Sequence, residues 1–168
     1  MERQERECVF AHGRLNVTGR DFNPVFAENR KARHDYTVLD TIECGIVLSG
    51  TEVKSVRAAH VSLKGAYAAV LKGELWLVGA DIAAYEYGNR FNHSPRAMRK
   101  LLVHSKEVES LRLKTEAKGL TLVPLKVYLK HGRVKVCIGI CRGKNAADRR
   151  ESLKVKDIER ENARYVRK

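Results

Sequence analysis

The sequence lacks a long uncharged hydrophobic run. Its longest weakly charged stretch, residues 73–85, still contains Glu74 and Asp81 and is too short to cross a bilayer. The first ten residues mix charges of both signs and contain no apolar segment, so we expect no secretory signal. These observations predict a cytoplasmic protein with no membrane partner.

Motifs for chemistry at an active site are also scarce. The four cysteines include no Cys-x-x-Cys pair, and the six histidines show no metal-ligand spacing. Cys137 and Cys141 are expected to be small, reduced strand residues, and no Gly-rich phosphate loop is present. His34 precedes Asp35, but adjacent strand residues point to opposite faces, so we expect no acid–base pair. The sequence therefore predicts no enzyme, cofactor or metal site.

Positive charge is what the sequence has in quantity. Its 33 Lys and Arg outnumber 20 Asp and Glu among 168 residues, which gives a formal net charge of +13. Residues 96–135 alone carry eleven basic residues against three acidic ones. Such a surface suits a polyanion, and the interleaved Tyr128 suits stacking on an unpaired base. Nucleic acid is the favoured partner; the alternatives are an ordinary solvated basic face, an acidic protein and a lipid surface.

Three zones follow one another along the chain. Residues 1–28 form a polar, irregular leader without periodicity, and residues 29–141 carry the apolar periodicity of a folded body. Residues 142–168 form a tail with ten basic, five acidic and only five large apolar residues. Since so little apolar area cannot offset the entropy of ordering, we expect the tail to be disordered alone and helical on a partner.

Turn and cap signals divide the body. Residues 36–48 predict a strand with a bulge at Gly45, and Lys72-Gly73 predicts a tight hairpin turn. The Ser-x-x-Glu spacing from Ser49 to Glu52 predicts a capped short helix. A second helix is expected over residues 105–118, with Ser105 as its cap, Val108 and Leu111 facing inward, and Gly119 ending it.

The last hairpin has the clearest alternation, with its turn at His131-Gly132 and Pro124 marking an edge or a bulge. About six short strands with few helices predict a mainly β fold, a small closed antiparallel barrel whose filled interior leaves ligands to bind outside. One face of the hairpin is expected to be apolar, with Val123, Leu125, Val127, Leu129, Val134, Val136, Ile138 and Ile140. The other is expected to carry Lys126, Tyr128, Lys130, Arg133 and Lys135.

Six segments together resemble the SsrA-binding protein family, SmpB, in the family's own order. They span nearly everything from residue 28 to residue 151. The segments are ENRKARHDY (28–36), ECGIVLSGTEVKSVRA (43–58), ELWLVGADIAAYE (74–86), RKLLVH (99–104), KGLTLVPLKVYLKHGRVKVCIGICRGK (118–144) and DRRE (148–151).

The resemblance implies a barrel of the oligonucleotide-binding type with a few peripheral helices, no cofactor and no enzymatic activity. It also implies binding to the tRNA-like domain of tmRNA. Together with elongation factor Tu, the protein would deliver alanyl-tmRNA to a ribosome stalled on a truncated message. The basic tail would then enter the empty mRNA channel at the decoding centre of the small subunit and fold there as a helix.

The resemblance also implies individual RNA contacts. Asn29 and Glu43 match polar family positions, and a carboxylate such as Glu43 must accept hydrogen bonds from base edges or ribose hydroxyls. Lys100 would contact phosphate, Leu102 a base or sugar, and His104 would donate or stack. Further RNA contacts are expected at Arg30, Lys31, Arg33, His34, Lys126, Tyr128 and Lys130. Tail contacts with the ribosome are expected at Arg142, Lys144, Arg149, Arg150, Lys154 and Lys156.

Departures from the family pattern occur at three positions: Thr51 replaces a tryptophan, and Asn145 and Ala147 replace a lysine and a stacking residue. Two other functions share the charge and the fold. One is a ribosomal or ribosome-assembly protein, which needs no dedicated RNA. The other is a single-strand nucleic-acid binder, against which the 7% aromatic content argues.

Overall fold

The computed structural model describes residues 24–145 and residue 148, and the protein is mainly β in this part of the chain. The strands are β1 (Val25–Glu28), β2 (Tyr36–Ile46), β3 (Val61–Ser62), β4 (Tyr67–Leu71), β5 (Glu74–Val78), β6 (Asp81–Ile82), β7 (Arg99–Leu102), β8 (Thr121–Lys130) and β9 (Arg133–Gly143). The helices are α1 (Arg30–Asp35), α2 (Gly50–Arg57) and α3 (Ser105–Lys118), with a short 3-10 turn, η1 (Asn89–Phe91).

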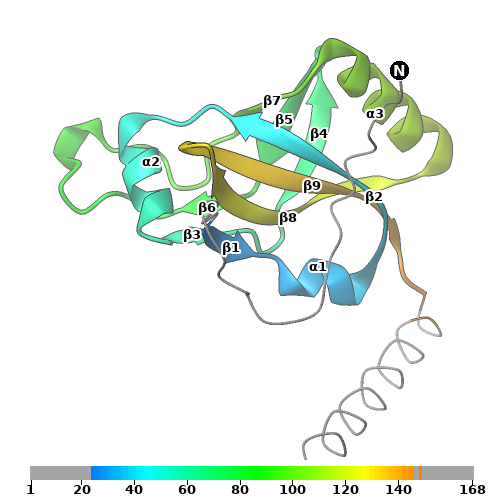
Figure 1. Cartoon of the computed structure of the whole chain (residues 1–168), viewed down its shortest axis with the longest axis horizontal. Coiled ribbons are helices and arrows are strands. Elements are labelled where there is room, and N and C mark those ends of the chain that lie inside the picture. The colour runs from blue at the N-terminus through cyan, green and yellow to red at the C-terminus, as the bar shows by residue number, and fades with distance from the viewer. Residues whose placement is uncertain (1–23, 146–147, 149–168) are drawn as a thin grey trace, which may run out of the picture.

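Antiparallel pairing of the strands closes on itself. Seven strands follow the order β1-β8-β4-β5-β7-β2-β9, and β8 also pairs with β9, so six of them form a ring. The strands β3 and β6 form a separate two-stranded sheet. In Figure 1, α2 and α3 lie at opposite ends of this arrangement, and α1 lies below the long strands. The mainly β prediction is confirmed, with more strands than the six expected.

Both predicted tight turns are present. Lys72 and Gly73 have φ angles of 51° and 76°, and His131 and Gly132 have 49° and 73°. Two successive positive φ angles match the twist of the flanking strands, and glycine adopts the second without steric cost. These turns set the β4–β5 and β8–β9 registers.

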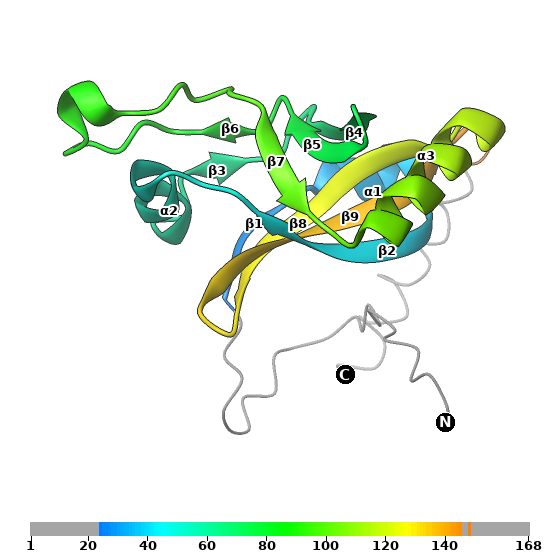
Figure 2. The same cartoon turned by 90° about the horizontal axis from the view of Figure 1, so that it is seen from above.

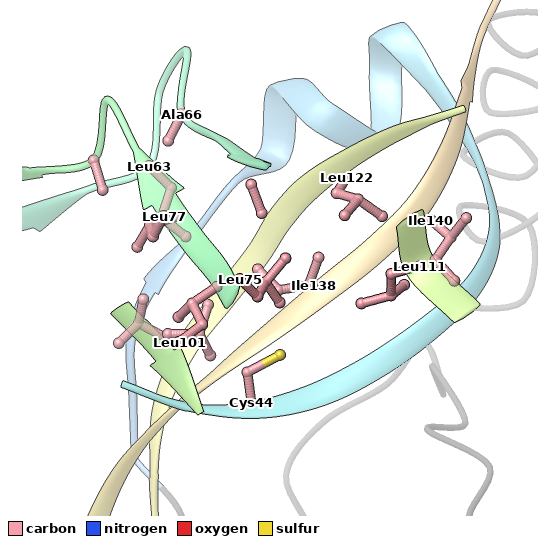
Figure 3. Packing of buried hydrophobic residues seen from close by; sticks show 14 of the residues in the cluster. Cys44, Leu63, Ala66, Leu75, Leu77, Leu101, Leu111, Leu122, Ile138 and Ile140 are labelled. Carbon is pink, nitrogen blue, oxygen red and sulfur yellow. The ribbon is translucent and has the colours of Figure 1, made fainter. Parts of the chain in front are cut away.

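Apolar side chains fill the space inside the ring of strands. Leu75 and Leu77 of β5 and Ile138 of β9 point inward (Figure 3). Val136 of β9 belongs to the same cluster, and all four residues are at most 1% exposed. Leu111 of α3 joins the same cluster, so α3 covers one end of the core. The predicted alternation of β9 is confirmed, since Cys137 and Cys141 point away from this core.

The predicted alternation of β8 was wrong before the bulge, because Val123 and Leu125 lie in a second cluster on the outer side and not in the core of the ring. The register shifts between Pro124 and Lys126, so one extra residue lies opposite β9 and inverts the parity of the strand. After this shift Val127 enters the ring and Tyr128 lies on the outer side, as predicted. A second core cluster forms there from Ala32, Val123, Leu125, Tyr128, Cys137 and Cys141.

The bulge of β2 also lies elsewhere than expected. It falls between Val38 and Asp40, whereas Gly45 is paired on both sides, with Leu102 of β7 and Lys135 of β9. A Cβ atom at position 45 would lie 3.2 Å from the Cβ of Leu102. This contact is tight, so a side chain at position 45 would press against Leu102 where β2 and β7 approach closely.

Two boundaries and one local structure differ from the sequence prediction. Residues 25–28 form β1, which pairs with Lys126–Tyr128 of β8, rather than an irregular leader. Residues 30–35 form α1 instead of an extended entry to the sheet, because Asn29 caps them. The strand β9 continues to Gly143, past the expected start of the tail. Residues 1–23 lie outside the described part.

The capping box of α2 is confirmed, and it leads into a buried ion pair. The Ser49 backbone N–H donates to Glu52 Oε2 (2.7 Å), and Arg99 Nε donates to Glu52 Oε1 (2.7 Å). Burial alone would raise the pKa of Glu52, but hydrogen bonds from Ser49 and Arg99 and the Arg99 charge lower it. The Arg99 guanidinium also donates to the carbonyls of Ala80, Ser94, Pro95 and Ala97.

Removing this guanidinium is expected to destabilise the fold strongly. The Arg99→Met variant leaves a buried carboxylate uncompensated, so the free energy of unfolding should fall by about 3–5 kcal/mol. Urea denaturation measures this change. Arg96→Met is the control, because Arg96 pairs with Asp81 at 3.1 Å but its side chain is 79% exposed. Its loss should stay below about 1 kcal/mol; similar losses in both variants would contradict the prediction.

Candidate nucleic-acid interface

The carboxylate of Glu43 is the centre of a polar cluster on the outside of the ring. Its neighbour Cys44 points into the core, so Glu43 points outward from β2. Tyr128 Oη donates to Glu43 Oε2 (2.5 Å), and Lys130 Nζ donates to the same oxygen (2.9 Å). Lys135 Nζ lies 3.8 Å from Glu43 Oε1. The cluster therefore joins β2 to both strands of the last hairpin.

These partners keep Glu43 ionised. Burial alone would raise the pKa of the carboxyl group, but the hydrogen bonds from Lys130 and Tyr128 and the charges of Lys130 and Lys135 outweigh it, and the pKa is lowered. The side chain is still 30% exposed. A ligand that reaches this face meets the Glu43 carboxylate, a hydrogen-bond acceptor, with lysine side chains around it.

A row of three residues crosses the outside next to this cluster. Gly45 pairs with Lys135 on one side and with Leu102 on the other. Leu102 is 51% exposed although it is a large apolar residue. Because Gly45 has no side chain, the flank of Leu102 toward β2 is open to contact.

Beside this row lies a cleft of about 470 Å³ between α2, the end of β7 and the tip of the last hairpin. We call it the Leu102 cleft. Apolar side chains and three cations share its lining, which suits a ligand that combines apolar rings or sugars with phosphate. The lining residues are Gly45, Ile46, Leu48, Val53, Arg57, Leu102, Gly132, Arg133, Val134 and Lys135.

Lys100 and His104 lie on either side of Leu102 along the chain. Leu101 is buried in the ring, so the alternate residues Lys100 and Leu102 project outward. Lys100 Nζ donates to Glu74 Oε1 (2.5 Å) and is 40% exposed. His104 is exposed, and its backbone N–H donates to Glu107 Oε2 (3.0 Å). His104 is thus the N-cap position of α3, one residue before the predicted Ser105.

The family resemblance implied RNA contacts at Glu43 on β2 and at Lys100, Leu102 and His104 on or just after β7. Strands β2 and β7 are antiparallel, and Gly45 pairs with Leu102. Two residues beyond Leu102 the chain reaches His104, and two residues before Gly45 lies Glu43, so both positions lie toward the same end of the strand pair. Glu43, Lys100 and Leu102 therefore lie on the outer face of two adjacent strands, and His104 follows β7 as the N-cap of α3.

Asn29 has a structural role. Its side chain is buried, Oδ1 accepts from the Ala32 N–H (3.1 Å), and Nδ2 donates to the carbonyls of Leu63 and Pro124 (3.1 Å each). Both amide protons are used inside the protein, so Asn29 positions α1 instead of offering donors to a ligand. The predicted RNA contact at Asn29 stays a prediction.

The basic residues of α1 are displayed at the surface. Arg30, Lys31, Arg33 and His34 are exposed, while Ala32 packs into the second core cluster. His34 Nδ1 and Asp35 Oδ1 lie 2.8 Å apart. The expectation that these two side chains diverge was wrong, because the segment is helical rather than extended.

Tyr128 is not available for stacking. It is 7% exposed, and Lys126 Nζ lies 5.0 Å from the centre of its ring. The β8 bulge turned this residue into the second core cluster, where its hydroxyl holds Glu43. Lys130 stays at the edge of the same face through Glu43.

The tail residues that the structure describes are tied to the body. Arg142 is exposed on β9 opposite Thr37, and the Lys144 backbone N–H donates to the Asp35 carbonyl (3.0 Å). Lys144 Nζ also donates to the Arg33 carbonyl (3.3 Å). Arg149, Arg150, Lys154 and Lys156 lie outside the described residues.

Three cations of the Leu102 cleft were not predicted as site residues. The alternation of the last hairpin placed Arg133 and Lys135 on a polar face, but only the Gly45–Lys135 pairing shows their nearness to Leu102. Arg57 ends α2 and carried no motif signal. At residues 24–145 and 148, no group of three or more His, Cys, Asp or Glu side chains is placed to hold a metal ion. No helix there is long and apolar enough to span a membrane.

Burial makes the thiols of Cys44, Cys137 and Cys141 poor nucleophiles. Burial raises the pKa of Cys44 to about 12 and that of Cys141 to about 11, and Cys137 is fully buried. Thiolates, which are the nucleophiles and metal ligands, are therefore disfavoured at these positions. The expectation of small buried strand residues at Cys137 and Cys141 is confirmed.

Fold and site together define a class: a β-rich protein with a filled interior that presents its cations, and one exposed apolar residue among them, on the outside of its strands. Comparison with known proteins identifies the member. The family described as SmpB protein matches residues 26–168, and the chain belongs to this family.

Relatives agree along most of the chain. This chain is 53% identical over 141 residues to the SsrA-binding protein of Ligilactobacillus salivarius. The matched residues make up 84% of this chain and 91% of the relative. The chain is 54% identical over 141 residues to the SsrA-binding protein of Staphylococcus saprophyticus, covering 84% and 92%. A solved structure described as "tmRNA-SmpB: a journey to the center of the bacterial ribosome" matches with a TM-score of 0.63 and 50% identity, covering 77% of this chain and 94% of that one.

The ionised state of Glu43 gives a pH-dependent prediction. Its pKa is lower in the folded protein than the ordinary 4.5, so the carboxylate stabilises the fold above pH 4.5 and this contribution disappears as the pH falls through the folded-state pKa. The difference in unfolding free energy between wild type and Glu43→Gln should be constant at neutral pH and shrink in acid. Urea denaturation at a series of pH values measures it.

The matched variant for this experiment is Tyr128→Phe, which keeps the buried ring and removes the hydroxyl donor to Glu43. In this background the folded-state pKa of Glu43 should lie closer to 4.5, so the shrinkage should be smaller and should be complete at a higher pH. Identical pH profiles with and without the hydroxyl would contradict the assigned role of Tyr128.

Proposed function

We propose that this protein binds the tRNA-like domain of tmRNA and serves in trans-translation, in which stalled ribosomes are rescued and incomplete peptides are tagged. Membership of the SmpB family over residues 26–168 carries the proposal. Relatives at 53–54% identity are named SsrA-binding proteins, and SsrA RNA is tmRNA. The cationic, partly apolar outer face supports the same conclusion, because folded RNA offers both phosphates and exposed base or sugar surfaces.

The Leu102 cleft and its surroundings are proposed as the RNA contact. Leu102 packs on a base or a ribose, and Arg57, Arg133 and Lys135 neutralise nearby phosphates. Glu43 accepts hydrogen bonds from base edges or ribose hydroxyls through Oε1, because Tyr128 and Lys130 both donate to Oε2. Its lowered pKa matters here, because only the ionised form offers acceptors alone.

Residues around this centre extend the contact. Lys100 reaches phosphate by exchanging its Glu74 partner, which costs little because both side chains are about 40% exposed. His104 donates or stacks at the start of α3. The cations of α1, namely Arg30, Lys31, Arg33 and His34, and the hairpin residues Lys126 and Lys130 widen the basic face.

Architecture and partners are proposed along the same line. The ring of strands is a closed barrel of the oligonucleotide-binding type, and RNA binds outside because the interior is filled. The tail beyond residue 145, with Arg149, Arg150, Lys154 and Lys156, is disordered alone and becomes helical in the mRNA channel near the decoding centre. Elongation factor Tu joins through the tmRNA complex. The protein acts in the cytoplasm, without enzymatic activity of its own.

The Leu102→Asp variant tests the proposed RNA contact. It removes an apolar surface and places negative charge beside phosphates, so affinity for a transcript of the tRNA-like domain should fall by at least about tenfold. Filter binding or fluorescence anisotropy measures the affinity. Leu113→Asp is the matched control, since Leu113 is 53% exposed on α3, away from the cleft, and should bind as wild type does.

Binding partners of the wild type discriminate the rival functions. A transcript of the tRNA-like domain should bind more tightly than an unstructured RNA of equal length. Equal binding of the two RNAs would favour a single-strand binder, and binding to mature ribosomal subunits without tmRNA would favour a ribosomal or assembly role.

Truncation after Asn145 tests the division of labour between body and tail. Lys144 and its bonds to α1 are kept, so the RNA-binding face should stay intact and affinity for the tRNA-like domain should not change. Peptide tagging on stalled ribosomes, followed in a reconstituted translation reaction, should be lost. A truncated protein that fails to bind the tRNA-like domain would show that body and tail do not act separately.

A further inference from the structure

Outside the Leu102 cleft, the most exposed aromatic group described lies in the loop between β6 and β7. We call residues 83–98 the tyrosine loop. Figure 2 shows this loop extending with α2 to one side of the ring, away from α3. Tyr87 within it is 75% exposed, more than Leu102 at 51%.

The tyrosine loop is held in a defined shape. The Tyr85 backbone N–H donates to Asn92 Oδ1 (2.9 Å), and Asn92 Nδ2 donates back to the Tyr85 carbonyl (2.7 Å). The Gly88 N–H donates to the same carbonyl (2.9 Å), and a Cβ atom at position 88 would lie 2.8 Å from Asn92 Cγ. Glycine is therefore required where Asn92 closes the loop. Tyr87 is therefore exposed on a loop whose backbone is held by hydrogen bonds between Tyr85 and Asn92.

A second aromatic ring and a cation stand behind Tyr87. The centres of the Tyr85 and Tyr87 rings lie 5.7 Å apart with an interplanar angle of 66°, the edge-to-face arrangement that aromatic pairs prefer. Lys54 Nζ of α2 lies 4.9 Å from the centre of the Tyr85 ring. Tyr87 thus packs against a ring that itself carries a cation on its face.

Charge around the loop favours an anionic partner. Arg96 pairs with Asp81, and Arg99 pairs with Glu52. Lys54 of α2 lies against Tyr85, and the loop itself carries Arg90 and Arg96 against the single acidic residue Glu86. A flat exposed ring with an excess of cations is the combination with which proteins bind unpaired bases of RNA.

We propose that Tyr87, backed by Tyr85 and Lys54, is a stacking platform for an unpaired base of an RNA. This contact is distinct from the Leu102 cleft, because Val53 and Arg57 of α2 line the cleft whereas Lys54 of the same helix faces Tyr85. The proposal rests on the proposed function for the identity of the RNA, which comes either from tmRNA or from the ribosome. A protein surface is the competing partner.

Three substitutions at position 87 test the platform in the full-length protein. Tyr87→Ala removes the ring, Tyr87→Leu keeps an apolar group without a π-face, and Tyr87→Trp keeps stacking. Affinities are measured separately for a transcript of the tRNA-like domain and for purified 70S ribosomes, each over a series of salt concentrations. Tyr67→Ala is the matched control, since Tyr67 is a 46% exposed tyrosine on β4.

For one of the two RNA sources, Tyr87→Ala and Tyr87→Leu should weaken binding by about 5- to 150-fold, while Tyr87→Trp and Tyr67→Ala should bind as wild type does. The salt dependence should not change, because no charge is removed. The source that responds identifies the RNA.

Wild-type affinity of Tyr87→Ala for both sources would overturn the platform and leave the proposed function standing. Full binding by Tyr87→Leu on the responding source would also overturn it, because an apolar protein contact would then explain the surface. Failure of the wild type to bind either source would overturn the proposed function together with the platform.

Discussion

The buried pair of Arg99 and Glu52 is the interaction on which the functional surfaces depend. Glu52 holds the first turn of α2 through the capping box, and Arg99 opens β7 and donates to the carbonyl of Ala80 and to three carbonyls within the tyrosine loop. A buried carboxylate and guanidinium are tolerated only when each has its partners, so these elements must be in place together. One ion pair thereby fixes a wall of the Leu102 cleft, the strand that displays Leu102, and the base of the loop that displays Tyr87.

Because the interior is filled, the proposed RNA contact lies on the outside of the strands. Each strand near the proposed contact serves both sides: Cys44 and Leu101 are buried, while Glu43 and Leu102 face outward. Placing a carboxylate on a cationic face opposes the binding of phosphate. The arrangement of Tyr128, Lys130 and Lys135 around Glu43 offsets this cost, because it spreads the negative charge over hydrogen bonds while the face keeps its positive excess.

Features with local causes were predictable from the sequence. Both tight turns, the capping box of α2 and the glycine that ends α3 depend on a few neighbouring residues. The errors arose where tertiary pairing decided the outcome. The bulge of β2 carries no residue signature, and although Pro124 marked the bulge of β8, the predicted faces did not allow for it; each bulge inverts the side-chain parity of its strand. The short helix α1 lacked periodicity because it buries a single residue, Ala32.

The two tyrosines show why composition could not settle the RNA surface. Tyr128 stands in a basic stretch that suggested stacking, but the β8 bulge buries it and gives it a supporting role beneath Glu43. Tyr87 lies next to an acidic residue in a stretch without any basic run, yet a clamped loop presents its ring to solvent. Stacking requires an exposed ring face near cations, and both conditions follow from tertiary structure. Because α2 carries Arg57 toward the cleft and Lys54 toward Tyr85, the two proposed RNA contacts are mechanically linked through one helix, and a change in the seating of α2 must alter both.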